Sequence, residues 1–355
     1  MKEWEDTFKE FAGHGKTALL IGDVDTGKTT FVRYMANYLS EKKLKVSIID
    51  ADIGQSTIGP PSTIGLATVE DRVESIENLP VKALYFTGAI SPVRHLLPCV
   101  IGTKKILDYA ISLSSDRIII DTTGFVTDSA AIALKQAKIE LVNPDFIFAF
   151  SRGRELEPIL YPYRYASKQM RHIEINGNVR KKSPEFRASE RKRKFLSYFK
   201  NSKKVRIKLQ STAVSGINYI SGDNLLHSNE LRWLSSTVDF PVTWGEKTGD
   251  RLTIGLSQLC ELRNIHEIKK RYSVSFVDIL DPLMFLAGFF NTGDECLSIC
   301  VITDFRPEKG FIEVLSPWTG NVEDVKRLHI GTYRLPEDIY EDCQAMAGYS
   351  QGSSL

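Results

Sequence analysis

The stretch "LLIGDVDTGKTT", residues 19–30, decides the fold of the first half of this chain. Gly22 is followed after four residues by Gly27, Lys28 and Thr29, which is the spacing of a phosphate-binding loop. An apolar run precedes the loop and an amphipathic run follows it, so strand, loop and helix stand in the order that phosphate binding requires. The alternative is a tight strand-to-helix turn in which the Lys-Thr pair is incidental.

If the stretch is a phosphate-binding loop, its backbone N–H groups point inward at phosphate oxygens, and the following helix adds its positive end. The Lys28 ammonium then lies against the β- and γ-phosphates, and the Thr29 hydroxyl ligates Mg²⁺. The predicted nucleotide-binding residues are Gly22, Asp23, Val24, Asp25, Thr26, Gly27, Lys28, Thr29 and Thr30.

Length and composition indicate a folded protein of more than one part. A chain of 355 residues favours two domains, or one large domain with an appendage. Hydrophobic residues make up 42% and charged residues 25%, which leaves little room for long disordered tracts. No segment reaches the roughly 18 consecutive apolar residues of a membrane span, and the first residues lack the apolar core of a secretion signal. We therefore expect a cytoplasmic protein that does not enter a membrane.

The cysteines predict neither disulfides nor a metal site. There are five, at positions 99, 260, 296, 300 and 343, and none forms a Cys-x-x-Cys pair. Cys296 and Cys300 lie in "CLSICVI", which is typical of a buried strand rather than a metal knuckle. We expect reduced thiols.

Short apolar segments alternate with amphipathic ones through the first half of the chain. The predicted strands are 17–22, 45–52, 83–89, 116–124 and 145–153, and the predicted helices are 28–42, 99–114 and 128–140. This alternation predicts an α/β fold of the phosphate-loop NTPase type, a doubly wound and mostly parallel sheet with ligands at the carboxyl ends of its strands.

After about residue 205, strand-like segments separated by turn signals predict a smaller β-rich carboxyl-terminal domain. The expected organisation is an amino-terminal extension (1–16), a phosphate-loop domain with a basic segment at 180–204 (17–204), the β-rich domain (205–347) and a frayed tail (348–355).

Acidic residues follow two of the predicted strands at the edge where the phosphate loop lies. "SIIDADIGQ" places Asp50, Asp52 and Gln55 after one strand, and "IIID" ends in Asp121. A carboxylate there can hold Mg²⁺ or accept a proton from an attacking hydroxyl, and the amide can order a water or a metal ligand. Spacing alone does not assign the three acids to these two roles, and strand-end capping is the structural alternative.

The stretch from Arg180 to Lys208 carries 13 Lys and Arg against two Glu. It is either a solvated helix face or a surface for a polyanion such as nucleic acid. Arg187 and Arg191 share one face of a helix here, where two guanidinium groups could cover a transferring phosphoryl group as a lid. Phe125, which follows Gly124 at a strand end, could be a core residue or a stacking surface for a base.

With these residues in view, the chain resembles the polynucleotide 5′-hydroxyl kinase family. That family includes archaeal and bacterial RNA and DNA kinases, the kinase subunit of the eukaryotic messenger-RNA cleavage factor, and nucleolar ribosomal-RNA kinases. "DADIGQ" is similar to the family's Asp-x-x-Gln motif on Asp52 and Gln55, and "FTGAISPVRHLLP", which contains Ser91 and His95, resembles its Phe-x-Gly-x-x-Ser-Pro stretch. "TTGF" resembles the family's Thr-x-Gly-Trp clasp, with Phe in place of Trp, and "RASER" resembles its Arg-x-x-x-Arg lid.

The resemblance implies transfer of the γ-phosphate of ATP, with GTP as a second possible donor, to the 5′-hydroxyl of RNA or DNA. Asp52 would be the general base, assisted by Gln55, and Mg²⁺ would be the metal. The other implied roles are charge stabilisation by Lys28, Arg187 and Arg191; metal binding by Thr29 with Asp50 or Asp121; and nucleic-acid binding by Thr122, Gly124, Phe125, Ser91 and His95.

Two other classes of protein remain open. One is a phosphate-loop GTPase or ATPase that works as a switch, although no clear Asn/Thr-Lys-x-Asp motif for reading guanine stands at a strand end. The other is an ATP-binding scaffold in RNA processing that transfers no phosphate. Protein partners are not predicted.

Overall fold

The protein is described by a computed structural model that covers residues 2–175, 181–216, 220–256 and 264–349. The chain divides into two compact units, Met1–Tyr198 and Phe199–Leu355. This division falls shortly before the expected boundary at 204. Arg180, Cys260 and the end of the predicted tail lie outside the described residues.

Among the described residues, seven strands form the sheet of the first unit, in the order β4-β3-β2-β5-β1-β6-β7. They are β1 (Thr17–Gly22), β2 (Val46–Ala51), β3 (Thr63–Val69), β4 (Val81–Phe86), β5 (Arg117–Thr122), β6 (Phe146–Phe150) and β7 (Gln169–Ile173). All neighbours pair in parallel except β3, which is antiparallel to both β2 and β4. The predicted doubly wound, mostly parallel sheet is confirmed, and β3 and β7 are additions to it.

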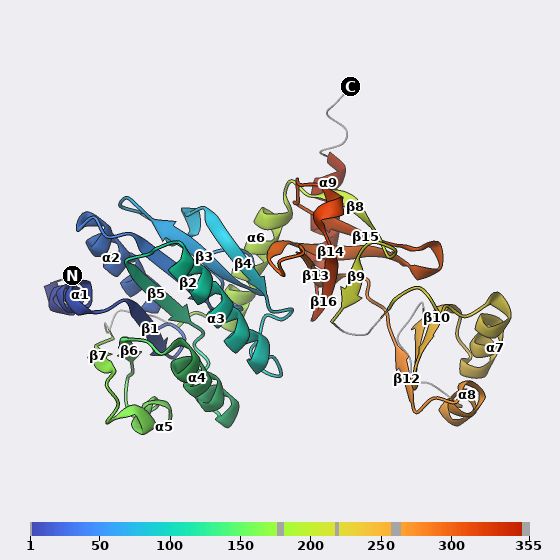
Figure 1. Ribbon diagram of the computed structural model, residues 1–355, viewed down its shortest axis with the longest axis horizontal. Helices are drawn as coiled ribbons and strands as arrows, with labels where there is room; N and C mark the ends of the chain where they lie inside the picture. The colour runs from blue at the N-terminus through green and yellow to red at the C-terminus, as the bar shows by residue number, and fades with distance from the viewer. Residues whose placement is uncertain (1, 176–180, 217–219, 257–263, 350–355) are drawn as a thin grey trace. The chain divides into compact units, whose positions relative to one another are not determined.

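Helices cover both faces of this sheet (Figure 1). The helices in the described residues up to Phe199 are α1 (Lys2–His14), α2 (Lys28–Glu41), α3 (Leu96–Ser112), α4 (Ser129–Val142), α5 (Glu157–Leu160) and α6 (Pro184–Phe199). Alternate residues of β1 face opposite cores, because side chains of a strand alternate between faces. Leu20 packs with Phe31 of α2, whereas Leu19 packs in a second cluster with Leu134 of α4.

The predicted amino-terminal extension is part of the first unit. Its residues form α1, and Phe8 and Phe11 of this helix are buried in the same cluster as α2. Phe8 meets Phe31 edge-on with ring centroids 5.1 Å apart, and Phe11 meets Phe146 at 5.4 Å. Aromatic pairs of this geometry stabilise the fold by more than the area they bury. The α1 helix therefore completes the hydrophobic core in which α2 is packed.

In the second unit, the described residues form a six-stranded sheet, β8-β15-β14-β13-β16-β9, and a three-stranded sheet, β10-β11-β12. The strands are β8 (Lys203–Lys208), β9 (Ala213–Ser215), β10 (Val242–Thr248), β11 (Arg251–Leu256), β12 (Phe276–Ile279), β13 (Phe285–Phe290), β14 (Cys296–Arg306), β15 (Phe311–Ser316) and β16 (Arg327–Arg334); the helices are α7 (Ser228–Val238), α8 (Ile265–Tyr272) and α9 (Glu337–Tyr349). The β-rich carboxyl-terminal part is confirmed, with three helices that were not expected.

The cysteines of the described residues, at positions 99, 296, 300 and 343, include two fully buried thiols in the sheets and helices of the two units, Cys99 and Cys300. Burial raises the pKa of the Cys300 thiol well above its usual range, which keeps the group neutral. No helix in the described ranges combines the length and the apolarity needed to cross a bilayer.

Candidate active site

The phosphate loop joins the carboxyl end of β1 to the first turn of α2. Gly22 is required at the start of the loop because a Cβ there would lie 2.7 Å from both Cβ and O of Phe150 on β6. Asp25 (φ 52°) and Gly27 (φ 89°) adopt left-handed conformations that curl the loop. The α2 helix then begins at Lys28, so its unpaired N–H groups face the pocket that the loop encloses.

The Lys28 side chain folds back on its own loop. Its Nζ donates to the backbone oxygens of Gly22 (2.9 Å) and Asp23 (2.7 Å). Burial lowers the pKa of Lys28, and the negative charges of Asp121 and Asp52 oppose that shift. The ammonium is held by the carbonyl groups of the loop, and a phosphate could replace these partners.

Thr29 and Asp121 form a pair of oxygen donors suited to a magnesium ion. The Thr29 hydroxyl donates to Asp121 Oδ2 over 2.7 Å, and Asp121 Oδ1 is buried without a hydrogen-bond partner among the described residues. Burial raises the pKa of Asp121, whereas Lys28 and Thr29 lower it. A hard cation is bound through oxygen ligands of this kind, so the residues present fit Mg²⁺.

Asp50 holds the chain that follows β2. Its Oδ1 accepts the backbone N–H of Asp52 (3.0 Å), and its Oδ2 accepts those of Thr57 and Ile58. Burial, and then the charges of Asp121 and Asp52, raise the pKa of Asp50 to about 7. Because both carboxylate oxygens are engaged by the backbone, this placement favours Asp121 over Asp50 as the metal ligand.

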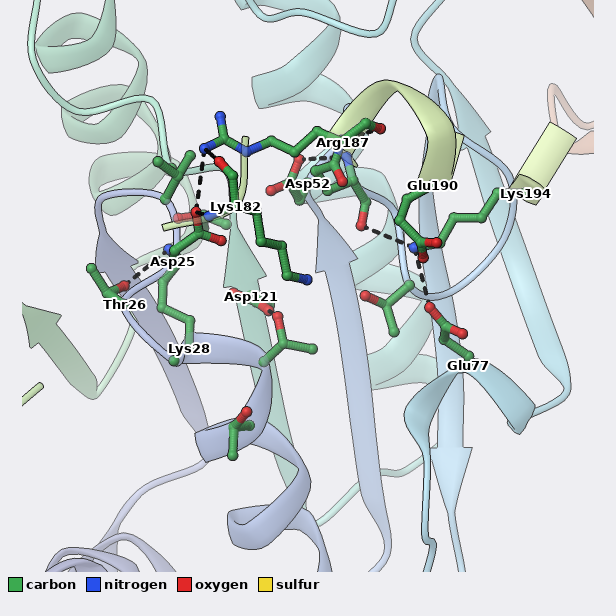
Figure 2. Close-up of a pocket in the computed structure, with 18 residues that line it drawn as sticks. Asp25, Thr26, Lys28, Asp52, Glu77, Asp121, Lys182, Arg187, Glu190 and Lys194 are labelled. Carbon is green, nitrogen blue, oxygen red and sulfur yellow. Dashed lines mark hydrogen bonds and ion pairs between the residues drawn. The ribbon is translucent and has the colours of Figure 1, made fainter. Parts of the chain in front are cut away.

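Asp52 and Gln55 line the pocket beside the phosphate loop (Figure 2). Asp52 Oδ1 accepts the backbone N–H groups of Gly54 (3.1 Å) and Gln55 (3.0 Å), which fixes the orientation of the carboxyl group. The second oxygen, Oδ2, has no hydrogen bond within the described residues. The Gln55 amide donates to the backbone oxygen of Arg187 over 3.4 Å and so contacts the α6 helix, where the lid is predicted.

The Thr122 hydroxyl is hydrogen-bonded to buried groups. It donates to the backbone oxygen of Leu20 (2.7 Å) and accepts from Lys135 Nζ (2.7 Å), which also donates to the backbone oxygen of Thr123 (2.6 Å). Burial, with the neighbouring charges of Lys138 and Lys28, lowers the pKa of Lys135 well below its usual range. The hydroxyl therefore ties the loop after β5 to β1, and a direct contact of Thr122 with nucleic acid stays a prediction.

Gly124 lies directly against the phosphate loop. A Cβ at position 124 would stand 2.4 Å from both N and Cγ1 of Val24, a distance that no side chain can occupy without movement of the loop. Phe125, the next residue, is partly buried against the core cluster that contains Leu134. Phe125 could be a core residue or a stacking surface for a base, and this placement supports a core contact for part of its ring.

The segment with Ser91 and His95 lies next to the Asp52 loop. A Cβ at Gly54 would stand 2.8 Å from the backbone oxygen of Ile90. Ser91 is exposed, its hydroxyl accepting from the N–H of Val93, and His95 precedes the first turn of α3. Neither residue is among the described residues that line the pocket.

The α6 helix, which carries the two predicted lid arginines, brings Arg187 to the pocket. Arg187 lines it together with Glu190 and Lys194, whereas Arg191 is not among its lining residues. Lys194 Nζ donates to the backbone oxygen of Ser56 (2.6 Å) and forms an ion pair with Glu77 (3.2 Å). Helical spacing of three and seven residues places these side chains on one face, so Arg187 and Lys194, rather than Arg187 and Arg191, face the pocket.

The pocket gathers most of the residues predicted from the sequence. Those that line it are Val24, Asp25, Thr26, Gly27, Lys28, Thr29, Thr30, Asp52, Gln55, Asp121, Thr122, Gly124 and Arg187. Those that do not are Gly22, Asp23, Asp50, Ser91, His95, Phe125 and Arg191. The lining residues that the sequence analysis missed are Thr57, Glu77, Lys182, Glu190 and Lys194.

Comparison with known proteins finds relatives that match most of this chain. The family profile described as mRNA cleavage and polyadenylation factor CLP1 P-loop matches residues 22–201. The polyribonucleotide 5′-hydroxyl-kinase of Pyrococcus abyssi is 33% identical over 90% of this chain and 88% of its own length. That of Pyrococcus horikoshii is 32% identical over 91% of this chain and 86% of its own length.

A solved complex of Clp1p with a Pcf11p fragment has the same fold. It matches with a TM-score of 0.62 over 94% of this chain and 78% of the solved chain, at 12% identity. The sequence match, the phosphate loop in its place after β1, and the pocket that joins it to Asp52 lead to one assignment. The chain belongs to the CLP1 P-loop family and, within it, groups with the polyribonucleotide 5′-hydroxyl-kinases.

Proposed function

We propose that this protein transfers the γ-phosphate of ATP to the 5′-hydroxyl of a polynucleotide, with RNA as the principal acceptor. One observation carries the proposal: a carboxylate with an unengaged oxygen, that of Asp52, lies in the same pocket as Lys28 and the phosphate loop. In phosphoryl transfer to a hydroxyl, a carboxylate at this place can accept the proton of the attacking oxygen. The names of the Pyrococcus relatives support RNA as the acceptor.

In the proposed reaction, Asp52 accepts the proton of the 5′-hydroxyl as that oxygen forms a bond to the γ-phosphorus and the bond to the β-phosphate oxygen breaks. Lys28 and Arg187 stabilise the charge that develops on the phosphoryl oxygens. Thr29 and Asp121 are the residues that would hold Mg²⁺, which neutralises charge on the β- and γ-phosphates when bound. Phosphorylated polynucleotide and ADP are the products.

The proposal is tested by measuring ADP release with three mixtures: ATP alone, ATP with 5′-hydroxyl RNA, and ATP with the same RNA already phosphorylated at its 5′ end. A kinase releases ADP in proportion to 5′-hydroxyl ends. Equal release in all three mixtures would identify a nucleotide hydrolase instead. Parallel assays with DNA and with GTP measure the choice of acceptor and donor.

The two lid arginines are expected to differ in their effect on transfer. Arg187→Ala should lower the turnover number by roughly ten- to a hundredfold, because a charge-assisted hydrogen bond to the phosphoryl group is lost. Arg191→Ala should cost less, since the Arg191 side chain is not part of the pocket lining. Steady-state kinetics of the two variants checks this order, and a larger loss for Arg191→Ala would show that the lid moves before transfer.

A further inference from the structure

The phosphate loop contains an acid that phosphate binding does not explain. Asp25 stands in the middle of "GDVDTGKTT" and lines the pocket with Lys28. A carboxylate at this position repels the negatively charged phosphates of a nucleotide. The side chain therefore has either a compensating partner or another task.

The partner is the lid. Asp25 Oδ2 accepts the backbone N–H of Lys182 (2.8 Å) and pairs with Nη2 of Arg187 (3.2 Å). The same Nη2 donates to the backbone oxygen of Lys182 over 2.7 Å, so the three groups form a closed arrangement. Figure 2 shows Arg187 extending over the pocket from α6 towards Asp25.

The arrangement is shielded from solvent. The side chains of Arg187 and Asp25 are 26% and 12% exposed, so their ion pair is screened less than an ordinary surface pair. The loop itself is braced on the other side, because Arg152 Nη2 donates to the backbone oxygen of Asp25 over 2.7 Å. Asp25 is thus a fixed point to which the lid is attached.

The guanidinium of Arg187 keeps donors for a further ligand. Its bonds to Asp25 and Lys182 both use Nη2, and its Nε is buried without a hydrogen-bond partner among the described residues. Because a buried unsatisfied donor is costly, it indicates a partner that binds during function. Arg187 lines the pocket above the phosphate loop, where the donor phosphates of the proposed reaction would lie.

We propose that Asp25 is a positioning residue that tethers Arg187 of the lid to the phosphate loop and so sets its guanidinium against the transferring phosphoryl group. This inference rests on the proposed kinase function. The tether holds the positive charge of Arg187 in the pocket before the substrate binds. The guanidinium then needs no reorganisation when negative charge develops on the phosphoryl oxygens. The negative charge of Asp25 weakens ground-state binding of ATP, and its effect on the transition state is favourable.

Asp25→Asn is the test variant, because asparagine can still accept the Lys182 N–H but cannot form the ion pair with Arg187. The turnover number is expected to fall by roughly ten- to a hundredfold, the effect of losing a charge-assisted hydrogen bond. The KM for ATP should stay unchanged or decrease, since one negative charge has left the loop. A structural defect would instead raise KM and lower the melting temperature together.

Asp23→Asn measures the effect of removing a charge alone. Asp23 lies in the same loop, but its carboxylate accepts only from the neighbouring N–H of Val24 over 2.7 Å and does not touch the lid. Its substitution therefore removes the same charge without loosening Arg187. A turnover number reduced equally by Asp23→Asn and Asp25→Asn would overturn the tether.

A double-mutant cycle with Arg187→Met isolates the coupling. In the Arg187→Met background, adding Asp25→Asn should change the turnover number by less than about twofold, because the tethered group is already gone. A full additional loss would overturn the proposal. An increase of turnover by Asp25→Asn in the wild-type background would also overturn it, since Asp25 would then withhold Arg187 from the phosphate.

Hydrogen exchange of the Lys182 amide gives a readout that needs no activity. In the ligand-free protein this amide donates to Asp25 Oδ2, so Asp25→Ala should increase its exchange rate, whereas Asp23→Ala should not. Equal protection in both variants would contradict the tether. Absence of transfer by the wild-type protein would overturn the proposed function, whereas transfer that is insensitive to Asp25→Asn would overturn the tether alone.

Discussion

Asp52→Asn is expected to lower the rate of phosphoryl transfer by roughly 10²- to 10⁴-fold, the usual contribution of a general base. Asparagine retains the oxygen that accepts the N–H groups of Gly54 and Gln55, so the loop after β2 keeps its shape. It cannot accept the proton of the attacking hydroxyl. ATP affinity, measured by calorimetry, and the melting temperature should therefore remain near those of the wild-type protein.

Asp50→Asn is the matched control, because it makes the same chemical change two residues away. Both carboxylate oxygens of Asp50 accept backbone N–H groups, and asparagine would leave at least one of them unpaired. The expected result is a lower melting temperature, with a loss of stability of about 1–3 kcal/mol. Transfer retained by Asp52→Asn but abolished by a stably folded Asp50→Asn would reverse the assignment of the base.

Gly124→Ala is expected to damage nucleotide binding although it adds one methyl group. The new Cβ would stand 2.4 Å from the backbone N of Val24, so the phosphate loop or the loop after β5 has to move. Overpacking of this kind costs about 1–3 kcal/mol, and here the strain falls on the atoms that hold phosphate. Calorimetric titration with ATP should show weaker binding, and thermal unfolding should show a lower melting temperature.

Gly13→Ala is the matched control for Gly124→Ala. A Cβ at Gly13, in α1, would meet no atom within 4 Å, and alanine is favoured over glycine in a helix. Its nucleotide affinity should equal that of the wild-type protein. If Gly124→Ala binds ATP as tightly as Gly13→Ala does, the phosphate loop does not depend on its close contact with the loop after β5.

The fold was predictable from the sequence where several features of one segment indicate the same structure. Residues 17–30 specify strand, loop and helix through apolar character, glycine spacing and the Lys-Thr pair, and the structure has β1, the loop and α2 there. The β3 strand was not predicted, although "TIGLATV" is rich in apolar and β-branched residues and is buried throughout. Alternation of strands and helices predicts parallel neighbours, and it contains no signal for an antiparallel strand inserted between β2 and β4.

The first helix, α1, carries a pattern of buried aromatic residues that its many charged residues made hard to recognise in the sequence. Trp4, Phe8 and Phe11 recur at helical spacing in "KEWEDTFKEFAGH", yet the sequence analysis assigned residues 1–16 only to an amino-terminal extension. Trp4 packs against the core cluster in which both phenylalanines are buried. Aromatic side chains bury enough surface to outweigh the polar residues of the opposite face, so the spacing of the aromatics was the more informative feature.

The site shows where sequence spacing stops being informative. Pairs four residues apart share a helix face, which led to Arg187 and Arg191, but the orientation of α6 brings Lys194 into the pocket instead. Lys135 was missed because lysines on a helix are usually solvated, whereas this one is fully buried among hydroxyl and carbonyl groups. Which face of a helix meets a site depends on packing with distant strands, which a local pattern does not contain.

The central claim is that phosphate moves from ATP to the 5′ end of a polynucleotide in the pocket formed by the phosphate loop and Asp52. Its most direct test is incubation of the full chain with γ-labelled ATP, Mg²⁺ and a 5′-hydroxyl RNA oligonucleotide, with Lys28→Ala and Asp52→Asn in parallel. The account predicts label at the 5′ end of the RNA with the wild-type protein and its loss in both variants. Hydrolysis of ATP without labelled RNA or DNA would contradict the account.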